Sequence, residues 1–401
     1  MNYVKLTIFS FLLCSVFSGH AHSQTAGQMN EQAMQLLRQG KVNDAIVKFV
    51  EVIKKDSLYV DAYTNLGFIY FTNGILKDAI DLYLQALMID EGNARAHNNL
   101  GAAYVAIGNN KSGVVEYKLA LKFKPDYPEA HSNLSYAFYN LAQYDLAEKH
   151  AKKAIEMSAN YAMAHNYLGL AYHAKGKLDE AIASFNKALE IRPNFVAVHN
   201  NLGIVYRSKL DFDRAIEFYS KAISLDSLNI DAMNGLGLSY LGKHENEKAI
   251  AEFSKVIKLA PKDPISHNNL SFAYYDKLDY AMAMQHAKAA EKNGLKMNEK
   301  YMADLTKALD DKFLRARHIL VENEDDAQAI LVEIQTGSDF GKLAAEKSID
   351  TNTARKGGDL GYFQKGDLQP VIEGAILNLK VGEISGVVQS DNGFHIFKRL
   401  K

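Results

Sequence analysis

The chain has 401 residues, of which 46 are Lys or Arg and 47 are Asp or Glu, so its formal net charge is −1. A chain of this length accommodates two or three domains. It has neither a basic excess nor a basic stripe, which argues against a nucleic acid as its partner.

Residues 1–23 have the pattern of a secretory signal. Lys5 precedes an apolar run over residues 6–17, which is too short to span a bilayer, and residues 21–23 form a small-x-small cleavage site. A retained N-terminal anchor is the alternative. Cys14 is the only cysteine, so the mature chain would have neither a disulfide nor a thiolate nucleophile. We expect an exported protein that is periplasmic or otherwise extracytoplasmic, with association with a membrane as an alternative.

A period of 34 residues runs through residues 26–297 without an insertion. The eight blocks are 26–59, 60–93, 94–127, 128–161, 162–195, 196–229, 230–263 and 264–297. Positions 8, 20 and 27 of the blocks carry mostly small residues, and position 11 is aromatic in seven of the eight. This pattern predicts one helical hairpin per block, because small residues let two helices approach closely and an aromatic side chain fills the remaining space.

Turn and stop signals punctuate the blocks. Prolines at position 32 follow the predicted second helix, and glycines supply the turn inside the hairpin; these residues are Pro125, Pro193, Pro261, Gly74, Gly108 and Gly176. In its period and at these positions the segment resembles the tetratricopeptide repeat family. The resemblance implies an all-α superhelical solenoid with a concave groove that holds a protein partner. Residues 298–312 are predicted to form a further helix that caps or links the array.

Histidine replaces the family's usual tryptophan at position 4 of five blocks. The residues are His97, His131, His165, His199 and His267. They occur once per repeat and are not paired at helical spacing, so we expect them to pack in the hairpins and expect no metal site.

Asparagine recurs at position 6 of the blocks, at Asn65, Asn99, Asn133, Asn201 and Asn269. An amide offers both a donor and an acceptor, so a ladder of amides in the groove can pair with the backbone of an extended peptide. The alternative is that these amides bond locally within the fold. Both interpretations are open from the sequence.

A different pattern begins near residue 298 and fills residues 313–401. It predicts strands at 316–321, 383–388 and 394–400, helices at 325–335, 340–347 and 370–379, and a hairpin turn at 390–393. We expect a small α+β domain with a four-stranded sheet.

Four segments of this domain occur in the order typical of one enzyme family. They are residues 317–321 (RHILV), 357–363 (GGDLGYF), 379–385 (LKVGEIS) and 392–396 (NGFHI). In these segments residues 313–401 resemble a parvulin-type (PpiC-type) peptidyl-prolyl cis-trans isomerase. The resemblance implies isomerisation of X–Pro bonds without a cofactor.

The resemblance also implies which residues form the site. His318 and His395 match the buried histidine pair, Asp350 a position held by cysteine or aspartate, and Ser390 a supporting hydroxyl. The proline-binding residues are Leu360, Leu368 and Ile372, with Phe363 nearby and Gln369 at the rim. Ile372 departs from the family, which commonly has phenylalanine there.

The two parts together predict an exported foldase. Its repeats would bind a protein partner or unfolded, proline-containing client polypeptides, and its C-terminal domain would isomerise their X–Pro bonds. The alternative is a non-catalytic chaperone or assembly scaffold whose parvulin domain only binds peptides. A metal-dependent enzyme is disfavoured because no clustered ligand set occurs in the sequence.

Overall fold

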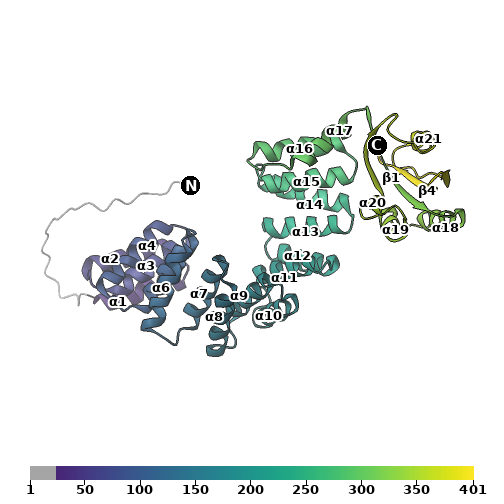
Figure 1. Cartoon of the computed structure of the whole chain (residues 1–401). Helices are drawn as coiled ribbons and strands as arrows, with labels where there is room; N and C mark the ends of the chain where they lie inside the picture. The colour runs from purple at the N-terminus through teal and green to yellow at the C-terminus, as the bar shows by residue number, and fades with distance from the viewer. Residues whose placement is uncertain (1–23) are drawn as a thin grey trace. The chain divides into compact units, whose positions relative to one another are not determined.

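A computed structural model describes residues 24–401, and the predicted signal at residues 1–23 lies outside the described part. The chain divides into two compact units, Met1–Ile191 and Arg192–Lys401. Both contain stacked helical hairpins, and the second also contains a small sheet domain (Figure 1).

Five helical hairpins make up the described residues of the first unit. The helices are α1 (Ala26–Arg38), α2 (Val42–Lys55), α3 (Val60–Thr72), α4 (Leu76–Ile89), α5 (Ala94–Ala106), α6 (Asn110–Phe123), α7 (Pro128–Asn140), α8 (Tyr144–Met157), α9 (Ala162–Ala174) and α10 (Leu178–Ile191). Each pair corresponds to one predicted 34-residue block.

The second unit begins with three more hairpins and a single helix. These are α11 (Val196–Ser208), α12 (Phe212–Leu225), α13 (Ile230–Gly242), α14 (Asn246–Leu259), α15 (Pro264–Asp276), α16 (Tyr280–Lys292) and α17 (Glu299–Leu309). Among residues 24–401, no helix combines the length and the apolar character that crossing a membrane requires.

Seven of the eight hairpins show a size match between positions 8 and 24; the first has Ala33 opposite Phe49. Where position 8 is glycine, position 24 is Tyr or Phe, and a Cβ on Gly169 would lie 2.6 Å from the ring of Phe185. Where position 8 is serine, position 24 is alanine, and the Ser135 hydroxyl instead donates to the carbonyl of Ala147 on the facing helix at 2.7 Å. In the repeats with glycine at position 8, the aromatic ring at position 24 fills the hairpin, and Tyr83 is an example that is fully buried.

The turn inside each hairpin needs a left-handed backbone. The predicted glycines provide it, with φ of 75° at Gly74, 82° at Gly108 and 74° at Gly176. Four repeats have other residues there, namely Ala142, Leu210, His244 and Leu278, with φ between 56° and 65°. These residues adopt a conformation that costs an L-residue free energy relative to glycine, so the turn geometry is imposed by the packed helices.

The C-terminal domain is an antiparallel sheet with helices on both faces. Its elements are β1 (Phe313–Val321), α18 (Glu324–Gln335), α19 (Phe340–Lys347), α20 (Thr351–Ala354), β2 (Asp359–Gln364), α21 (Pro370–Leu377), β3 (Val388–Ser390) and β4 (Gly393–Arg399). The strand order is β2-β1-β4-β3. Because side chains alternate along a strand, β1 buries Ile319 and Val321 against α18 and α19 and Ala316 on the opposite face, in a cluster that includes Ile376 of α21.

The predicted strand over residues 383–388 is wrong. Only Ile384 forms an isolated bridge, to Lys398, and the third strand is β3, which leads into the predicted hairpin turn. The Ser385 hydroxyl accepts the backbone N–H of Phe397, so a side chain replaces part of the ladder. The short helix α20 was not predicted, and α21 ends at Leu377, before the predicted end at residue 379.

The size match predicts that Gly169→Ser destabilises the first unit by about 1–3 kcal/mol, because the new side chain overlaps the Phe185 ring. Phe185→Ala alone should be destabilising through the cavity that it leaves. The double variant reproduces the serine–alanine pair of two other repeats, so its loss should be smaller than the sum of the single losses. Urea unfolding followed by circular dichroism measures all three; strictly additive losses would contradict the size match.

Candidate active site

Two buried histidines lie side by side on adjacent strands of the C-terminal domain. His318 is on β1 and His395 on β4, where His318 pairs with Phe397, so both imidazoles lie on one face of the sheet. They are 6% and 2% exposed, and their Nδ1 atoms are 3.3 Å apart. The Phe397 ring stacks on both imidazoles, at centroid distances of 6.1 and 5.3 Å. The strand pairing thus fixes the histidine pair.

A carboxylate and a hydroxyl bind the outer nitrogen of His318. Nε2 of His318 lies 2.8 Å from Oδ2 of Asp350 and 2.9 Å from Oγ1 of Thr353. Asp350 is the N-cap of α20, and the Thr353 hydroxyl donates to its carboxylate at 2.7 Å. The sequence interpretation missed Thr353; its signal is the three-residue spacing from Asp350, which places both on the first turn of a short helix.

A hydroxyl binds the outer nitrogen of His395 in the same way. Oγ of Ser390 lies 2.7 Å from Nε2 of His395, and the backbone N–H of Asn392 donates to that oxygen at 3.1 Å. The structure therefore brings all four predicted polar residues into one hydrogen-bonded chain.

One assignment of the protons satisfies every hydrogen bond between these four side chains while both imidazoles are neutral. His318 donates from Nε2 to the Asp350 carboxylate, so its Nδ1 is an acceptor. His395 then donates from Nδ1 to His318 and accepts at Nε2 from the Ser390 hydroxyl. All four ring nitrogens have partners, which is the condition for burying two imidazoles together.

The electrostatics agree with a neutral His395 and an ionised Asp350. Burial, helped by the neighbouring His318 and opposed by Asp350, lowers the pKa of His395 to about 4. Burial acts to raise the pKa of Asp350, but hydrogen bonds from Thr353, His318 and the Asn352 backbone outweigh it and hold that pKa below its usual value.

An apolar cluster adjoins the histidine pair. Leu360 from β2, Leu368 from the following loop and Ile372 from α21 are partly buried, and they pack against Phe363 and Phe397. Phe397 belongs to this cluster and also stacks on the histidines, so the apolar and polar parts share one side chain. Phe363 itself is only 5% exposed and supports the cluster from inside.

The loop between β2 and α21 is held by a residue that the sequence interpretation missed. Glu373 is 7% exposed, and its carboxylate accepts the backbone N–H of Gly366 at 2.7 Å. Gln369 is the exposed N-cap residue of α21, at the end of this loop. Nothing in the sequence pattern links Glu373 to Gly366, because the contact depends on how the loop folds back.

The five repeat histidines are packed in the hairpins. Nε2 of four of them approaches the backbone carbonyl six residues earlier, with distances of 3.0 Å for His97, 2.9 Å for His165 and His199, and 3.1 Å for His267. His131 pairs with His150, and His267 with His286, with Nδ1 atoms 3.0 Å apart in each pair. No group of three or more potential metal ligands occurs between residues 24 and 401.

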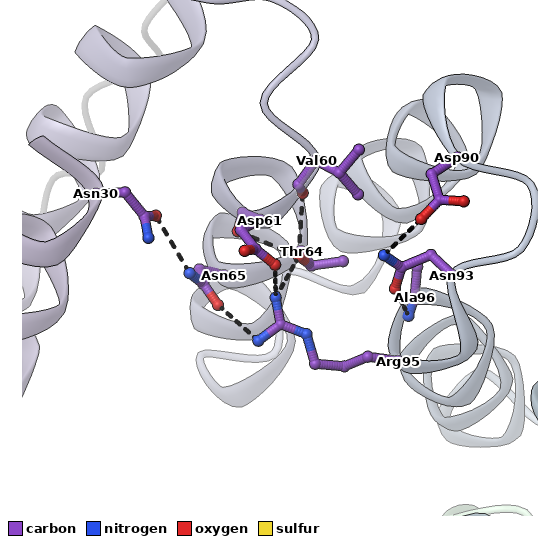
Figure 2. A network of polar contacts seen from close by, with 9 residues as sticks. All are labelled: Asn30, Val60, Asp61, Thr64, Asn65, Asp90, Asn93, Arg95 and Ala96. Carbon is purple, nitrogen blue, oxygen red and sulfur yellow. Dashed lines mark hydrogen bonds and ion pairs between the residues drawn. The ribbon is translucent and has the colours of Figure 1, made fainter. Parts of the chain in front are cut away.

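The position-6 asparagines bond between consecutive repeats. The Asn65 amide donates to Asn30 at 3.3 Å and accepts from Arg95, which also binds Asp61 and Thr64 (Figure 2). The remaining contacts follow the same pattern or bury the amide: Asn133 donates to Asn98 at 3.0 Å, Asn99 accepts from Asn98 at 3.4 Å, and Asn269 is 7% exposed. The contacts of Asn65 and Asn133 favour the local interpretation, although Asn65, Asn99, Asn133 and Asn201 are all half-buried.

Comparison with known families assigns the class of both parts. Residues 317–401 match the family model described as the PPIC-type PPIASE domain. Tetratricopeptide-repeat models match residues 69–108, 94–127, 128–161, 150–183, 169–209, 196–227 and 230–263. The chain therefore carries tetratricopeptide repeats followed by a C-terminal peptidyl-prolyl isomerase domain of the PPIC, or parvulin, type.

Among individual proteins, the chain is similar to bacterial foldases. It is 42% identical to the foldase protein PrsA of Oceanobacillus iheyensis over 119 residues, which cover 30% of this chain and 39% of that one. It is 47% identical to the foldase protein PrsA 2 of Bacillus anthracis over 85 residues, covering 21% of this chain and 30% of the relative. The matched segment thus spans well under half of these relatives.

Solved structures resemble the repeats in fold. The chain matches a structure of the APC/C hetero-tetramer Cut9-Hcn1 with a TM-score of 0.57 and 17% identity, over 71% of this chain and 56% of that one. It matches a tetratricopeptide repeat protein of Parabacteroides merdae with a TM-score of 0.51 and 20% identity, over 62% of this chain and 98% of that one.

We predict that His395 stays neutral until the pH falls to about 4, compared with an ordinary value of 6.5. Below pH 6.5 this histidine binds a proton in the unfolded chain but not in the folded one. The contribution of neutral His395 to the free energy of unfolding is therefore complete above pH 6.5. It decreases between pH 6.5 and 4, by up to roughly 3 kcal/mol.

Histidine-selective NMR measures this titration directly, and a His395 midpoint near 6.5 would contradict it. As a control, the His395→Gln variant should lose less stability than the native chain over the same interval of pH, because the other buried histidines titrate in both.

Proposed function

We propose that the chain is an exported peptidyl-prolyl cis-trans isomerase and foldase. Its repeats bind protein partners or unfolded, proline-containing client polypeptides, and its C-terminal domain isomerises their X–Pro bonds. The hydrogen-bonded pair of His318 and His395 beside the apolar cluster, in a domain of the PPIC type, carries this proposal. The predicted signal at residues 1–23 supports export to the periplasm or another extracytoplasmic space.

The reaction needs a site that favours a twisted amide. Resonance gives the X–Pro bond a rotational barrier of about 20 kcal/mol, and rotation breaks no bond of the chain. In the proposed mechanism Leu360, Leu368 and Ile372 hold the proline ring away from water, with Gln369 at the rim. A twisted amide is less polar than a planar one, so an apolar, water-excluding surface lowers the barrier.

The polar chain supplies fixed dipoles without a mobile charge next to the amide. Asp350 and Thr353 hold the outer nitrogen of His318, and Ser390 holds that of His395, so neither imidazole can rotate without losing a hydrogen bond. The histidines thereby present one fixed face beside the apolar cluster. Their proposed role is to order the site; no proton transfer to the substrate is required.

In the repeats, we propose that the concave surface binds polypeptide. Of the predicted ladder, Asn65, Asn99, Asn133 and Asn201 are half-buried, so part of each side chain is accessible to a client backbone. Asn65 and Asn133 also tie neighbouring repeats together through hydrogen bonds to Asn30, Arg95 and Asn98.

A non-catalytic chaperone or assembly scaffold is the second candidate function. Ile372 favours it, because isoleucine keeps the cluster apolar but lacks the flat ring that the family places over proline. In that case the domain binds proline-containing peptides without accelerating isomerisation.

Asp350→Asn should lower kcat/KM for a proline peptide at least about tenfold, because a charged acceptor of His318 is lost. Thr353→Val should have a smaller effect in the same direction. The assay is an NMR exchange or protease-coupled measurement on the full chain. Asp339→Asn is the matched control, since Asp339 also caps a helix of this domain but lies outside the polar chain. A native chain without acceleration would instead support the scaffold.

Ile372→Phe should raise kcat/KM several-fold, because a flat ring covers the proline better than a branched chain. Val371→Phe adds the same ring at the neighbouring position, which is 55% exposed, and should leave the rate unchanged. Equal rates for the two variants would show that position 372 does not limit activity.

A further inference from the structure

A buried ion pair joins the first two strands of the C-terminal domain. Arg315 of β1 binds Asp359 of β2 through two contacts, Nε to Oδ1 at 3.2 Å and Nη2 to Oδ2. The two side chains are only 17% and 16% exposed. The register of the strands shifts between Arg315 and Arg317, and this irregularity lies beside the ion pair.

Asp359 connects the ion pair to the apolar cluster. Its Oδ1 also accepts the backbone N–H of Gly361 at 2.9 Å, closing a turn around Leu360. Gly361 has a φ of 76°, a left-handed conformation that glycine adopts without steric cost. The direction of Leu360 therefore depends on the carboxylate of Asp359, and through it on Arg315.

The third contact of Arg315 reaches the eighth repeat. Its Nη1 donates to the hydroxyl of Tyr275 on α15, and its guanidinium lies 5.0 Å from the ring centre of Tyr362 on β2. The hydroxyls of Tyr275 and Tyr362 are 3.4 Å apart. Arg315 thus joins α15 of the last repeat to β2 of the C-terminal domain.

Tyr275 is itself held within the repeats. Its ring packs edge-on against Tyr280 of α16 and is tilted against Tyr301 of α17, both at 5.4 Å. Tyr362 in turn packs on the cluster formed by α16 and α17. A second attachment is the Lys401 ammonium, which donates to the carbonyl of Lys307 at the end of α17 at 2.8 Å.

The charges at this junction are fixed. Burial opposes a charge on Arg315, but the hydrogen bond and attraction to Asp359 outweigh it and raise the pKa of the guanidinium. Burial likewise acts to raise the pKa of Asp359, and the Arg315 contacts hold it below its usual value. Removing one partner of such a pair leaves a buried, uncompensated charge.

We propose that Tyr275 of the last repeat and Arg315 are positioning residues of the isomerase site, acting through Asp359 on the turn that orients Leu360. This inference rests on the proposed function for its effect on rate. Its structural content is that the repeat array forms part of the support of the site, so the C-terminal domain works best when attached to its own last repeat.

The test uses the full chain. Tyr275→Phe removes one hydroxyl and keeps the ring, so kcat/KM should fall about fivefold. The loss should appear mainly in KM, because the displaced Leu360 belongs to the surface that binds proline. The Leu360 methyl signals in NMR should shift as well. Tyr274→Phe is the matched control: Tyr274 is the neighbouring residue on α15 and stacks on His286 inside the repeats.

A double-mutant cycle distinguishes positioning from a loss of stability. Arg315→Lys loses the two-pronged contact with Asp359 and should have a larger effect than Tyr275→Phe. Because both act through one network, adding Tyr275→Phe to Arg315→Lys should change kcat/KM and the Leu360 signals little further.

Unchanged kinetics and unchanged Leu360 signals in Tyr275→Phe would overturn the proposal, as would equal effects in Tyr274→Phe. An inactive native chain would overturn the proposed function and not this inference. In that event the Leu360 signals and the affinity for a proline peptide decide it: shifts and weaker binding in Tyr275→Phe alone support positioning, and their absence refutes it.

Discussion

Burying two imidazoles next to each other is the constraint on which the C-terminal domain depends. Water cannot satisfy the ring nitrogens there, and two positive charges 3.3 Å apart would repel strongly in a buried site. The domain meets this constraint with one directional chain from Ser390 to Asp350. The hairpin turn, the cap of α20 and the pairing of β1 with β4 each supply a part of it, so the domain's local structures are tied to the site.

The repeats contain the same contact in another setting. In the pairs His131–His150 and His267–His286 the Nδ1 atoms are 3.0 Å apart, and burial lowers the pKa of His150 to about 4. There the histidines come from the two helices of one hairpin, and no carboxylate orders them. The comparison shows that a pair of neutral histidines is a packing solution in itself; Asp350 and the adjacent apolar cluster are what distinguish the candidate site.

The sequence predicted what depends on local periodicity and family motifs. The 34-residue period predicts the helix pairs, and the family resemblance that four motifs carry leads to His318, Asp350, Ser390 and His395. The prediction from the sequence failed where a contact between distant segments determines the local structure. Ser385 takes over a ladder position, so the expected strand at residues 383–388 does not form. Thr353 was missed although its spacing from Asp350 is a local signal, whereas the contact of Glu373 and the bond from Arg315 to Tyr275 could not be predicted, because each depends on how the chain folds in space.

The match between positions 8 and 24 also bears on how such an array can diversify. A recombination event that falls between two hairpins keeps each glycine with its ring and each serine with its alanine. A crossover inside a hairpin joining the first helix of repeat four to the second helix of repeat five would place Ser135 against Phe185, and the reciprocal product would place Gly169 against Ala151. One product is overfilled and the other is hollow, so the unit of inheritance in this array is the whole hairpin and not the single helix.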